Sequence, residues 1–198
     1  MPVITFPDGN TKTFKNELSL FDIAKSISNS LAKEAVAGKI NGQLTDLCVA
    51  VESDCDVEII KKTDEEGLDI VRHSFAHLVG HAVKQLYPEA KMAIGPVIKE
   101  GFYYDIDFQD SLSESNLKKI ESKINHLINQ NYDVVREVVS AEKAIKVFDE
   151  RKENYKTEIV KEIPDGEIIA LYHHQEYTDM CRGPHVPNTK FLRHFKLT

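Results

Sequence analysis

Residues 69–86, DIVRHSFAHLVGHAVKQL, contain the pattern from which the rest of the fold can be placed. Apolar residues recur at the three- and four-residue intervals of an amphipathic helix, which predicts a helix that begins at Asp69 and stops near Tyr87 and Pro88. The apolar positions are Ile70, Val71, Phe75, Leu78, Val79, Ala82, Val83 and Leu86. His73 and His77 lie four residues apart, so both imidazoles project from one face of this helix.

A second polar stretch, DMCRGPH at residues 179–185, comes near the end of the chain. Cys181 and His185 have the same four-residue spacing, but Gly183 and Pro184 between them predict a loop instead of a helix. The two stretches together supply three imidazoles and one thiol, a set that suits tetrahedral zinc. The same groups suit proton transfer, because imidazoles titrate near neutral pH. The residues alone leave both interpretations open.

The size and composition of the chain bound its class. With 198 residues, 41% of them hydrophobic, it can hold one medium domain or two small ones. No apolar run approaches the roughly 20 residues that span a bilayer, and the start lacks a signal-peptide pattern, so we expect a cytoplasmic protein with no membrane partner. Three cysteines at unrelated spacings fit a reducing compartment. We expect Cys48 and Cys55, in or beside apolar runs, to be buried or half-buried.

The charge and the motifs exclude several functions. A formal net charge of −7 argues against a long nucleic-acid groove, in which lysine and arginine would neutralise phosphates, but it permits a short RNA contact. The sequence has no Gly-x-Ser-x-Gly elbow and no glycine-rich phosphate loop, which disfavours acyl-serine chemistry and nucleotide binding. On composition alone Lys156 and Asp179 are ordinary surface charges, and His81 is expected to be solvated.

The first 62 residues predict a small α+β unit. A β-hairpin around Pro7-Asp8-Gly9-Asn10 precedes a helix over residues 18–27 with Ser19 as its N-cap. Short strands are expected at residues 39–41, 47–50 and 57–60. Residues 61–67, KKTDEEG, contain no apolar side chain, so we predict a domain boundary there, between residues 62 and 63.

The remaining residues predict a second α+β unit that starts with the histidine-bearing helix. Its further elements are strands at 93–97 and 101–107, a helix from Ser113 to 128, a strand at 132–139, a helix at 141–151, a short connection carrying Lys156, and a strand at 168–172. The glycine-proline loop with Cys181 and His185 comes next.

Several motifs in this order resemble the amino-terminal part of bacterial threonyl-tRNA synthetases. They are RHSxAH at 72–77, VKQLYP at 83–88, KMAIGPVI at 91–98, GFYYD at 101–105 and DMCRGPHVP at 179–187. The resemblance covers essentially the whole chain. It implies a TGS domain, a ubiquitin-like β-grasp module, at residues 1–62, and an editing domain with a long helix packed on an antiparallel sheet at 63–198.

The family continues into an aminoacylation domain of class II, which uses ATP, magnesium and a catalytic zinc, and then into an anticodon-binding domain. This sequence ends before either, so we expect the chain neither to bind ATP nor to charge tRNA, and to require no cofactor. The family dimerises through its aminoacylation domain, and we expect this chain to be a monomer.

The resemblance implies hydrolysis of seryl-tRNA mischarged on the threonine tRNA, giving serine and free tRNA. Serine lacks one methyl group of threonine, and such a group changes discrimination by only about 1–3 kcal/mol, so a second sieve is expected. The expected partner is the acceptor end of the threonine tRNA carrying serine, bound weakly and in a salt-sensitive way.

The family's motifs assign site residues by position. The implied site residues are His73, His77, Lys156, Asp179, Cys181 and His185, with Tyr104 and Arg182 as weaker substrate-binding candidates. Our hypothesis is that Asp179 holds the substrate α-ammonium, while His73 and Lys156 activate water and stabilise the oxyanion. In this hypothesis His77, Cys181 and His185 shape the pocket and its hydrogen bonds.

The families that this sequence resembles differ in the metal content of the editing pocket. Related alanyl-tRNA editing domains hold zinc with the pattern matched by His73, His77, Cys181 and His185, whereas the threonyl branch works without a required metal, so we expect none here. Two alternatives remain. Bound zinc with activity on a tRNA-free ester would favour a zinc-dependent hydrolase of a small ester, and binding without turnover would favour a non-catalytic RNA-binding or regulatory module.

Overall fold

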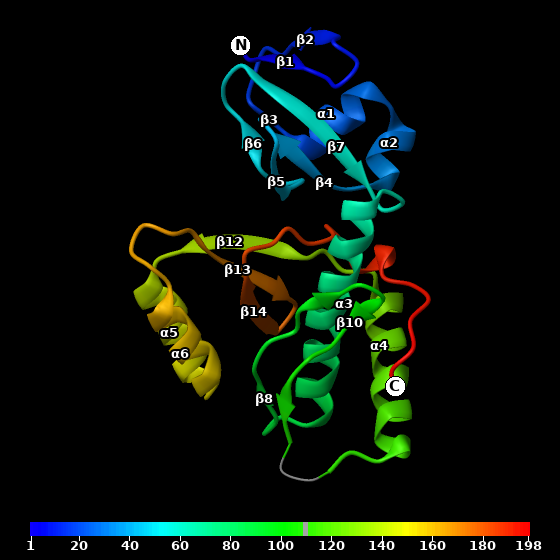
Figure 1. Cartoon of the computed structure of the whole chain (residues 1–198), viewed down its shortest axis with the longest axis vertical. Helices are drawn as coiled ribbons and strands as arrows, with labels where there is room; N and C mark the ends of the chain where they lie inside the picture. The colour runs from blue at the N-terminus through cyan, green and yellow to red at the C-terminus, as the bar shows by residue number, and fades with distance from the viewer. Residues whose placement is uncertain (109–110) are drawn as a thin grey trace. The chain divides into compact units, whose positions relative to one another are not determined.

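The structure, a computed structural model, describes residues 1–108 and 111–198 (Figure 1). These residues form two compact units: Met1–Val71 with Gly183–Pro187, and Arg72–Arg182 with Asn188–Thr198. The long helix α3, Glu65–Leu86, contains the division between Val71 and Arg72. Within the described ranges, no helix combines the length and the apolar character needed to cross a bilayer.

The first unit is a five-stranded mixed sheet with two helices. Its sheet order is β2-β1-β7-β4-β5, in which β1 and β7 are parallel and the other neighbours antiparallel. A short ladder joins β3 to β6. The elements are β1 Val3–Thr5, β2 Thr11–Thr13, β3 Leu18–Ser19, α1 Leu20–Ile27, α2 Asn29–Glu34, β4 Ala35–Ile40, β5 Gln43–Asp46, β6 Ala50–Val51 and β7 Cys55–Lys61.

The opening hairpin and the helix that follows it confirm the sequence predictions. Ser19 caps α1, because its hydroxyl accepts the backbone N–H of Asp22, and the Asp22 side chain completes the capping box. The apolar face of α1 is buried in the core of the unit. That core comprises Ile4, Phe14, Leu20, Ile23, Ala24, Ala32, Ala35, Leu47, Val51 and Val57.

The strand predicted at residues 47–50 is wrong for most of its length. The carbonyls of Leu47 and Val49 accept the N–H groups of Phe21 and Leu20 at 2.9 and 3.1 Å. These are the first N–H groups of α1, which have no partner inside the helix, so the segment serves the helix terminus instead of a sheet. Cys48 consequently lies in an exposed turn, against our expectation, whereas Cys55 is half-buried as expected.

The second unit combines two long helices, a helical hairpin and three small sheets. Besides its share of α3, its elements are β8 Lys91–Met92, β9 Val97–Ile98, β10 Gly101–Phe102, β11 Ile106–Asp107, α4 Glu114–Gln130, β12 Val135–Val139, α5 Ala141–Glu150, α6 Asn154–Glu162, β13 Ile169–His174, β14 Tyr177–Cys181 and the 3-10 turn Thr189–Phe191. The largest of these sheets is antiparallel, in the order β12-β13-β14. The expected α+β architecture, a β-grasp-like sheet followed by helices with antiparallel strands, is confirmed.

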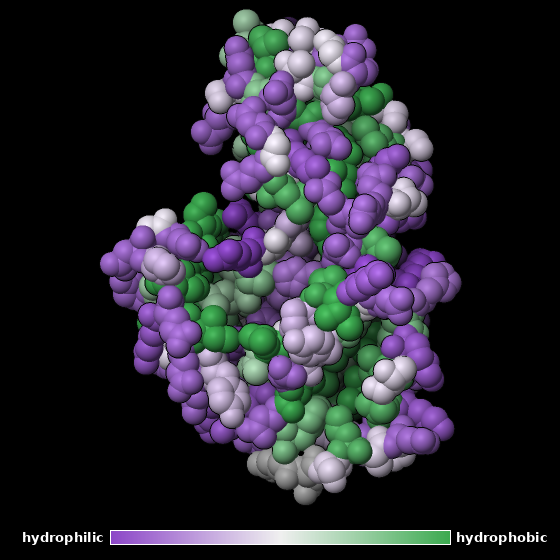
Figure 2. All heavy atoms as spheres, viewed as in Figure 1, coloured by the Kyte–Doolittle hydropathy of each residue, from purple (hydrophilic) through white to green (hydrophobic). Residues whose placement is uncertain are grey.

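Amphipathic patterns explain how the helices of this unit pack. Ser113 caps α4, whose buried face consists of Ile120, Ile124, Leu127 and Ile128. Helices α5 and α6 pack on β13 through a core of Ala144, Phe148, Val160, Ile169 and Leu171. Figure 2 shows mainly hydrophilic side chains on the outward surface of this helical hairpin, as a one-sided apolar stripe predicts.

Three further predictions need correction. Helix α3 begins at Glu65, a turn before Asp69, because the Asp64 carbonyl accepts the N–H of Leu68. The strands predicted at 93–97 and 101–107 form two short ladders, β8–β11 and β9–β10, on either side of Gly95. The connection expected to carry Lys156 is helix α6.

Candidate functional site

Helix α3 presents His73 and His77 as neighbours on one face, as the sequence predicts. Their ring centroids lie 5.2 Å apart with an interplanar angle of 85°, an edge-to-face arrangement. His73 is half-buried and His77 is buried. One ring therefore reaches the solvent side of the site while the other lies in the interior.

Cys181 ends strand β14, although the sequence predicted a loop at this residue. The ligand atoms of Cys181, His73 and His77 lie within 4.8 Å of one another. His185 follows four residues later in the Gly183–Pro187 segment of the first unit, where its backbone N–H donates to Asp46 Oδ1 at 3.0 Å. Within the second unit, three of the four residues in the predicted zinc pattern are thus close together.

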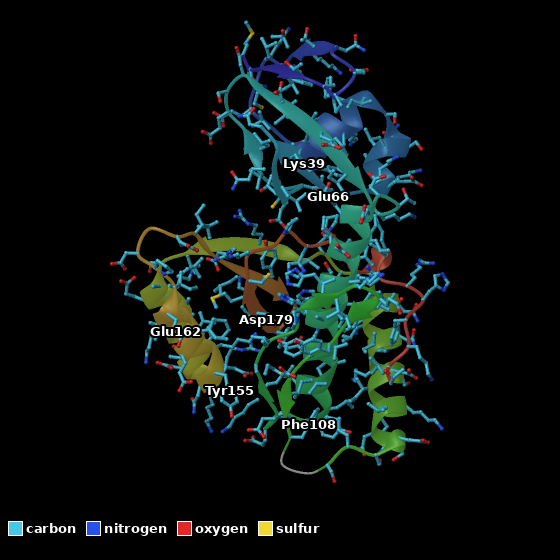
Figure 3. All side chains as sticks on the ribbon, in the orientation of Figure 1. Lys39, Glu66, Phe108, Tyr155, Glu162 and Asp179 are labelled. Carbon is cyan, nitrogen blue, oxygen red and sulfur yellow. The ribbon has the colours of Figure 1, made fainter. Side chains whose placement is uncertain are left out.

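Lys156 and Asp179 form a buried ion pair. Composition suggested surface charges, but their side chains are only 7% and 1% exposed, and Lys156 Nζ lies 2.6 Å from Asp179 Oδ1. Lys156 comes from α6 and Asp179 from β14, whose inner face lies toward α3 in Figure 3. His77 Nε2 approaches Asp179 Oδ2 to 3.8 Å. A buried charge pair of this kind costs desolvation energy and marks a site worth testing for function.

The Asp179 carboxylate accepts four hydrogen bonds. Oδ1 accepts from Lys156 Nζ at 2.6 Å and from the backbone N–H of Met180 at 2.8 Å. Oδ2 accepts from the hydroxyls of Tyr104 and Tyr177 at 2.7 and 2.9 Å. The Tyr104 hydroxyl also accepts from Lys156 Nζ at 3.2 Å. These four donors match the roughly four lone-pair positions of a carboxylate, so any further cation must replace a donor.

Burial and the Lys156 charge together set the ionisation of the titratable groups. It lowers the pKa of His73 below its ordinary value, with Asp179 opposing the shift, and it lowers the pKa of His77 much further. Burial raises the pKa of Asp179, but the charge of Lys156 and the hydrogen bonds from Lys156 and Tyr104 outweigh it, so that pKa lies below its ordinary value. At neutral pH the site therefore holds neutral imidazoles beside an ionised carboxylate.

His81 was expected to be solvated, and this prediction is wrong. The residue is fully buried, with Nδ1 2.9 Å from the Tyr132 hydroxyl and Nε2 3.0 Å from Glu176 Oε1. The Tyr132 hydroxyl also lies 3.3 Å from His174 Nδ1. These partners come from distant parts of the chain, which is why helical spacing alone could not reveal them.

Sequence analysis did not single out Tyr177, Tyr132 or His174. A signal for Tyr177 was present: Tyr177, Asp179 and Cys181 alternate along β14, and side chains at a two-residue period share one face of a strand. Recognising that strand would have placed all three together. No comparable local signal marks Tyr132.

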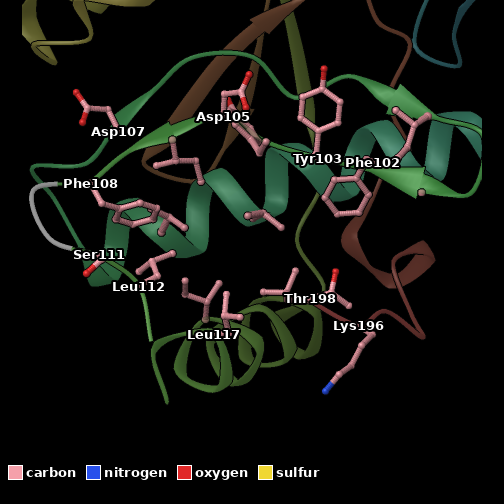
Figure 4. A pocket seen from close by; sticks show the side chains of 18 of the residues that line it. Phe102, Tyr103, Asp105, Asp107, Phe108, Ser111, Leu112, Leu117, Lys196 and Thr198 are labelled. Atoms are coloured by element: carbon pink, nitrogen blue, oxygen red, sulfur yellow. The ribbon is translucent and has the colours of Figure 1, made fainter. Parts of the chain in front are cut away.

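Tyr104 and Arg182, the weaker candidates, differ in position. Tyr104 is half-buried between β10 and β11 and joins the carboxylate cluster. Arg182 is 91% exposed, with Nη2 3.5 Å from Glu167 Oε2 at the surface. Tyr104 also lines a cavity of about 1020 Å³ between α3 and α4 (Figure 4), whose other walls include Val79, Val83 and Leu117. Apolar and polar side chains both line that cavity, and its described charged residues are Glu100, Asp105, Asp107 and Lys196.

The donor set in the second unit fits a metal in part. Ligands of a tetrahedral zinc lie roughly 3.5 Å from one another, so atoms within 4.8 Å could close on an ion with small side-chain movements. Within this unit, His73, His77 and Cys181 are residues that could hold zinc. The same imidazoles, kept neutral by burial, are also suited to accept protons.

Known proteins match this chain in two domains and over its whole length. A model of the TGS domain matches residues 1–61, and a model of the threonyl and alanyl tRNA synthetase second additional domain matches residues 169–198. A threonine–tRNA ligase of Prochlorococcus marinus (strain MIT 9211) is 55% identical over 197 residues. That match covers 100% of this chain but only 31% of the relative. The resemblance inferred from the motifs is confirmed, and the chain is homologous to the N-terminal region of a threonine–tRNA ligase, with a TGS domain followed by an editing-related second additional domain.

Proposed function

We propose that this chain hydrolyses seryl-tRNA mischarged on the threonine tRNA, with the serine-bearing acceptor end of that tRNA as its partner. The observation that carries the proposal is the buried Lys156–Asp179 pair beside the neutral imidazole of His73. Ester hydrolysis needs a group that accepts a proton from water and a cation that stabilises the oxyanion. Homology to a threonine–tRNA ligase makes an aminoacyl ester the natural substrate class.

The reaction can be assigned to residues step by step. His73 accepts a proton as the water oxygen bonds to the ester carbonyl carbon, and Lys156 stabilises the resulting oxyanion. The bond from that carbon to the ribose oxygen then breaks, and the imidazolium of His73 returns the proton to the ribose oxygen. Serine and tRNA with a free hydroxyl are the products.

The substrate ammonium is the proposed ligand of Asp179. Because that carboxylate already accepts four hydrogen bonds, the ammonium must replace one donor. Tyr104 is the donor best placed to yield, because it is half-buried and lies outside the strands, whereas Tyr177 is buried on β14. His77, Cys181 and His185 would bound the space around the serine side chain, where the extra methyl group of threonine would clash.

Metal-free hydrolysis is part of the proposal. The closeness of the His73, His77 and Cys181 ligand atoms favours one second candidate, a zinc-dependent ester hydrolase in which His185 completes the ligand set. In that case zinc would polarise the carbonyl or activate water, and His73 would no longer be the base. Zinc content of the purified protein and the effect of a strong chelator separate the two candidates.

The test is deacylation of seryl-tRNA and threonyl-tRNA, both on the threonine tRNA, with and without chelator. We expect release of serine, sparing of threonine and no chelator effect. His73→Ala should abolish hydrolysis with the fold retained, while His126→Ala, an exposed histidine on α4, should act like the wild type. Loss of activity in chelator would show that zinc, and not His73, activates the water. An unaffected His73→Ala variant would exclude His73 as the base.

A non-catalytic module is the remaining outcome. It would be supported if the chain bound the threonine tRNA with a steep salt dependence but released neither amino acid. Activity on a simple serine ester without tRNA would instead favour the small-ester hydrolase.

A further inference from the structure

Tyr177 is a buried tyrosine that the proposed reaction does not use directly. It lies on β14 two residues before Asp179, so both side chains share one face of the strand. Its side chain is 2% exposed, and its hydroxyl donates to Asp179 Oδ2 at 2.9 Å. A buried hydroxyl that donates to a carboxylate favours the ionised form and fixes its rotamer.

The surroundings of Tyr177 hold its ring in one place. A Cβ atom at Gly80 of α3 would lie 2.4 Å from the Tyr177 hydroxyl oxygen and 2.9 Å from Cζ, so only glycine leaves room for the ring. The ring stacks on His81 with a centroid distance of 5.8 Å and an angle of 7°. The guanidinium of Arg151 lies 5.4 Å from its centroid.

The stacking partner is itself fixed from several directions. His81 contacts the Tyr132 hydroxyl and the carboxylate of Glu176, and Gln85 Nε2 donates to the same carboxylate oxygen. Arg151 donates to the Glu176 carbonyl at 2.8 Å. The Tyr177 ring therefore packs against His81 and Arg151, which are both hydrogen-bonded to Glu176 in the turn before β14.

Tyr104, the other donor to Oδ2, has a looser setting. It is half-buried and lies on the segment between β10 and β11. A Cβ at Gly95 would lie 2.8 Å from its ring, so it too depends on a glycine, but no aromatic stacking of its ring corresponds to the Tyr177–His81 contact among the described residues. Tyr177 is thus suited to hold the Asp179 carboxylate in place, whereas Tyr104 is suited to give way to another donor.

We propose that Tyr177 is a positioning residue that keeps the Asp179 carboxylate oriented while the substrate ammonium takes the place of the Tyr104 hydroxyl. This inference rests on the proposed hydrolysis of seryl-tRNA for its kinetic consequence. Its structural part, that Tyr177 sets the orientation of the Asp179 carboxylate, does not depend on activity. Gly80 is the residue that makes this position available to a tyrosine.

The first test compares Tyr177→Phe with Tyr87→Phe. Tyr87 is a matched control, because its hydroxyl accepts from Asn116 Nδ2 at 2.9 Å and does not contact Asp179. Losing a hydrogen bond to a charged group should lower kcat/KM for seryl-tRNA deacylation about tenfold in Tyr177→Phe. The control should stay within about twofold of the wild type.

The split between kcat and KM separates positioning from a merely structural role. Asp179 is the proposed ligand of the substrate ammonium, so a carboxylate that has lost its Tyr177 donor should bind the substrate less well. Tyr177→Phe should therefore raise KM for seryl-tRNA more than it lowers kcat. A lowered kcat at an unchanged KM would overturn the proposal.

A second variant displaces the hydroxyl without removing it. Gly80→Ala should push the Tyr177 ring away from Asp179 and lower kcat/KM to a similar extent. Because both changes act through one contact, the double variant Gly80→Ala/Tyr177→Phe should lose no more than the worse single variant. Additive losses of kcat/KM would show that Gly80 and Tyr177 act independently. That result would contradict the proposal that Gly80 makes room for the Tyr177 ring.

Crystal structures of the variants test the inference without any activity. In Tyr177→Phe the Asp179 carboxylate should turn to another rotamer or become more mobile than in wild type and in Tyr87→Phe, and an unchanged carboxylate would overturn the positioning role. If the wild type fails to hydrolyse seryl-tRNA while the Asp179 carboxylate moves as expected, the proposed function fails and the positioning of Asp179 stands.

Discussion

Removing either partner of the buried Lys156–Asp179 pair should lower the free energy of unfolding by an amount that can be estimated. The two charged atoms lie 2.6 Å apart, and the side chains are 7% and 1% exposed, so removing one partner leaves the other charge buried without compensation. That situation typically costs about 3–5 kcal/mol. We therefore expect Lys156→Met and Asp179→Asn each to lower the free energy of unfolding of the second unit by this amount.

The double variant separates the pair's interaction from the effects of each side chain. Lys156→Met/Asp179→Asn removes both charges, so its loss should be smaller than the sum of the single losses by about 2–3 kcal/mol. The double variant should fold and yet fail to deacylate seryl-tRNA, because the proposed oxyanion cation and ammonium ligand are both gone. The contribution of the pair to stability would then be separated from its contribution to catalysis.

The assay can report on the second unit alone. The chain contains no tryptophan, and all seven tyrosines lie between Tyr87 and Tyr177, within that unit. Tyrosine fluorescence during urea unfolding at pH 7 therefore follows its stability. The exposed Glu137–Lys143 pair offers a control cycle, Glu137→Gln with Lys143→Met, whose coupling should stay below about 1 kcal/mol. Losses at Lys156 and Asp179 that add within about 0.5 kcal/mol would refute the argument.

Further predictions concern pH, a helix cap and a thiol. Burial lowers the pKa of His174 from 6.5 to about 3, so below pH 6.5 the unfolded state binds a proton that the folded state excludes. This residue alone therefore lowers the free energy of unfolding by about 1.4 kcal/mol per pH unit down to pH 3. His174→Phe should flatten this slope in urea unfolding between pH 7 and 5, and parallel slopes would disprove the assignment. Ser113→Ala removes the N-cap of α4 and should cost about 1 kcal/mol in the same assay, whereas Ser122→Ala on the exposed helix surface should cost little; equal losses would argue against the cap. The exposed Cys48 should react with a thiol reagent faster than the half-buried Cys55 and Cys181, and a fast phase that survives in Cys48→Ser would contradict this order.

Local patterns in the sequence were sufficient for the principal helices of both units. Apolar spacing predicts α1 and α4, and Ser19 was recognised as the cap of α1, because burying one face and satisfying the first N–H groups are requirements of the helix itself. The pair His73 and His77 follows from the same periodicity in α3. The assignment of Lys156 and Asp179 to the site came from family motifs, since charge and spacing alone suggested surface residues.

Tertiary structure decided the features whose partners lie far away in the chain. Helix α6 has no side-chain cap, and its buried residues pack with those of α5 and β13, so its helical state depends on that packing. His81 is buried because Tyr132 and Glu176, 51 and 95 residues away, satisfy its ring nitrogens. The Lys156–Asp179 pair and the donation from Tyr177 likewise exist only once α6 and β14 lie together. Sequence periodicity determines which face of an element is apolar, but a polar side chain can be buried only where the folded chain supplies its hydrogen-bond partners.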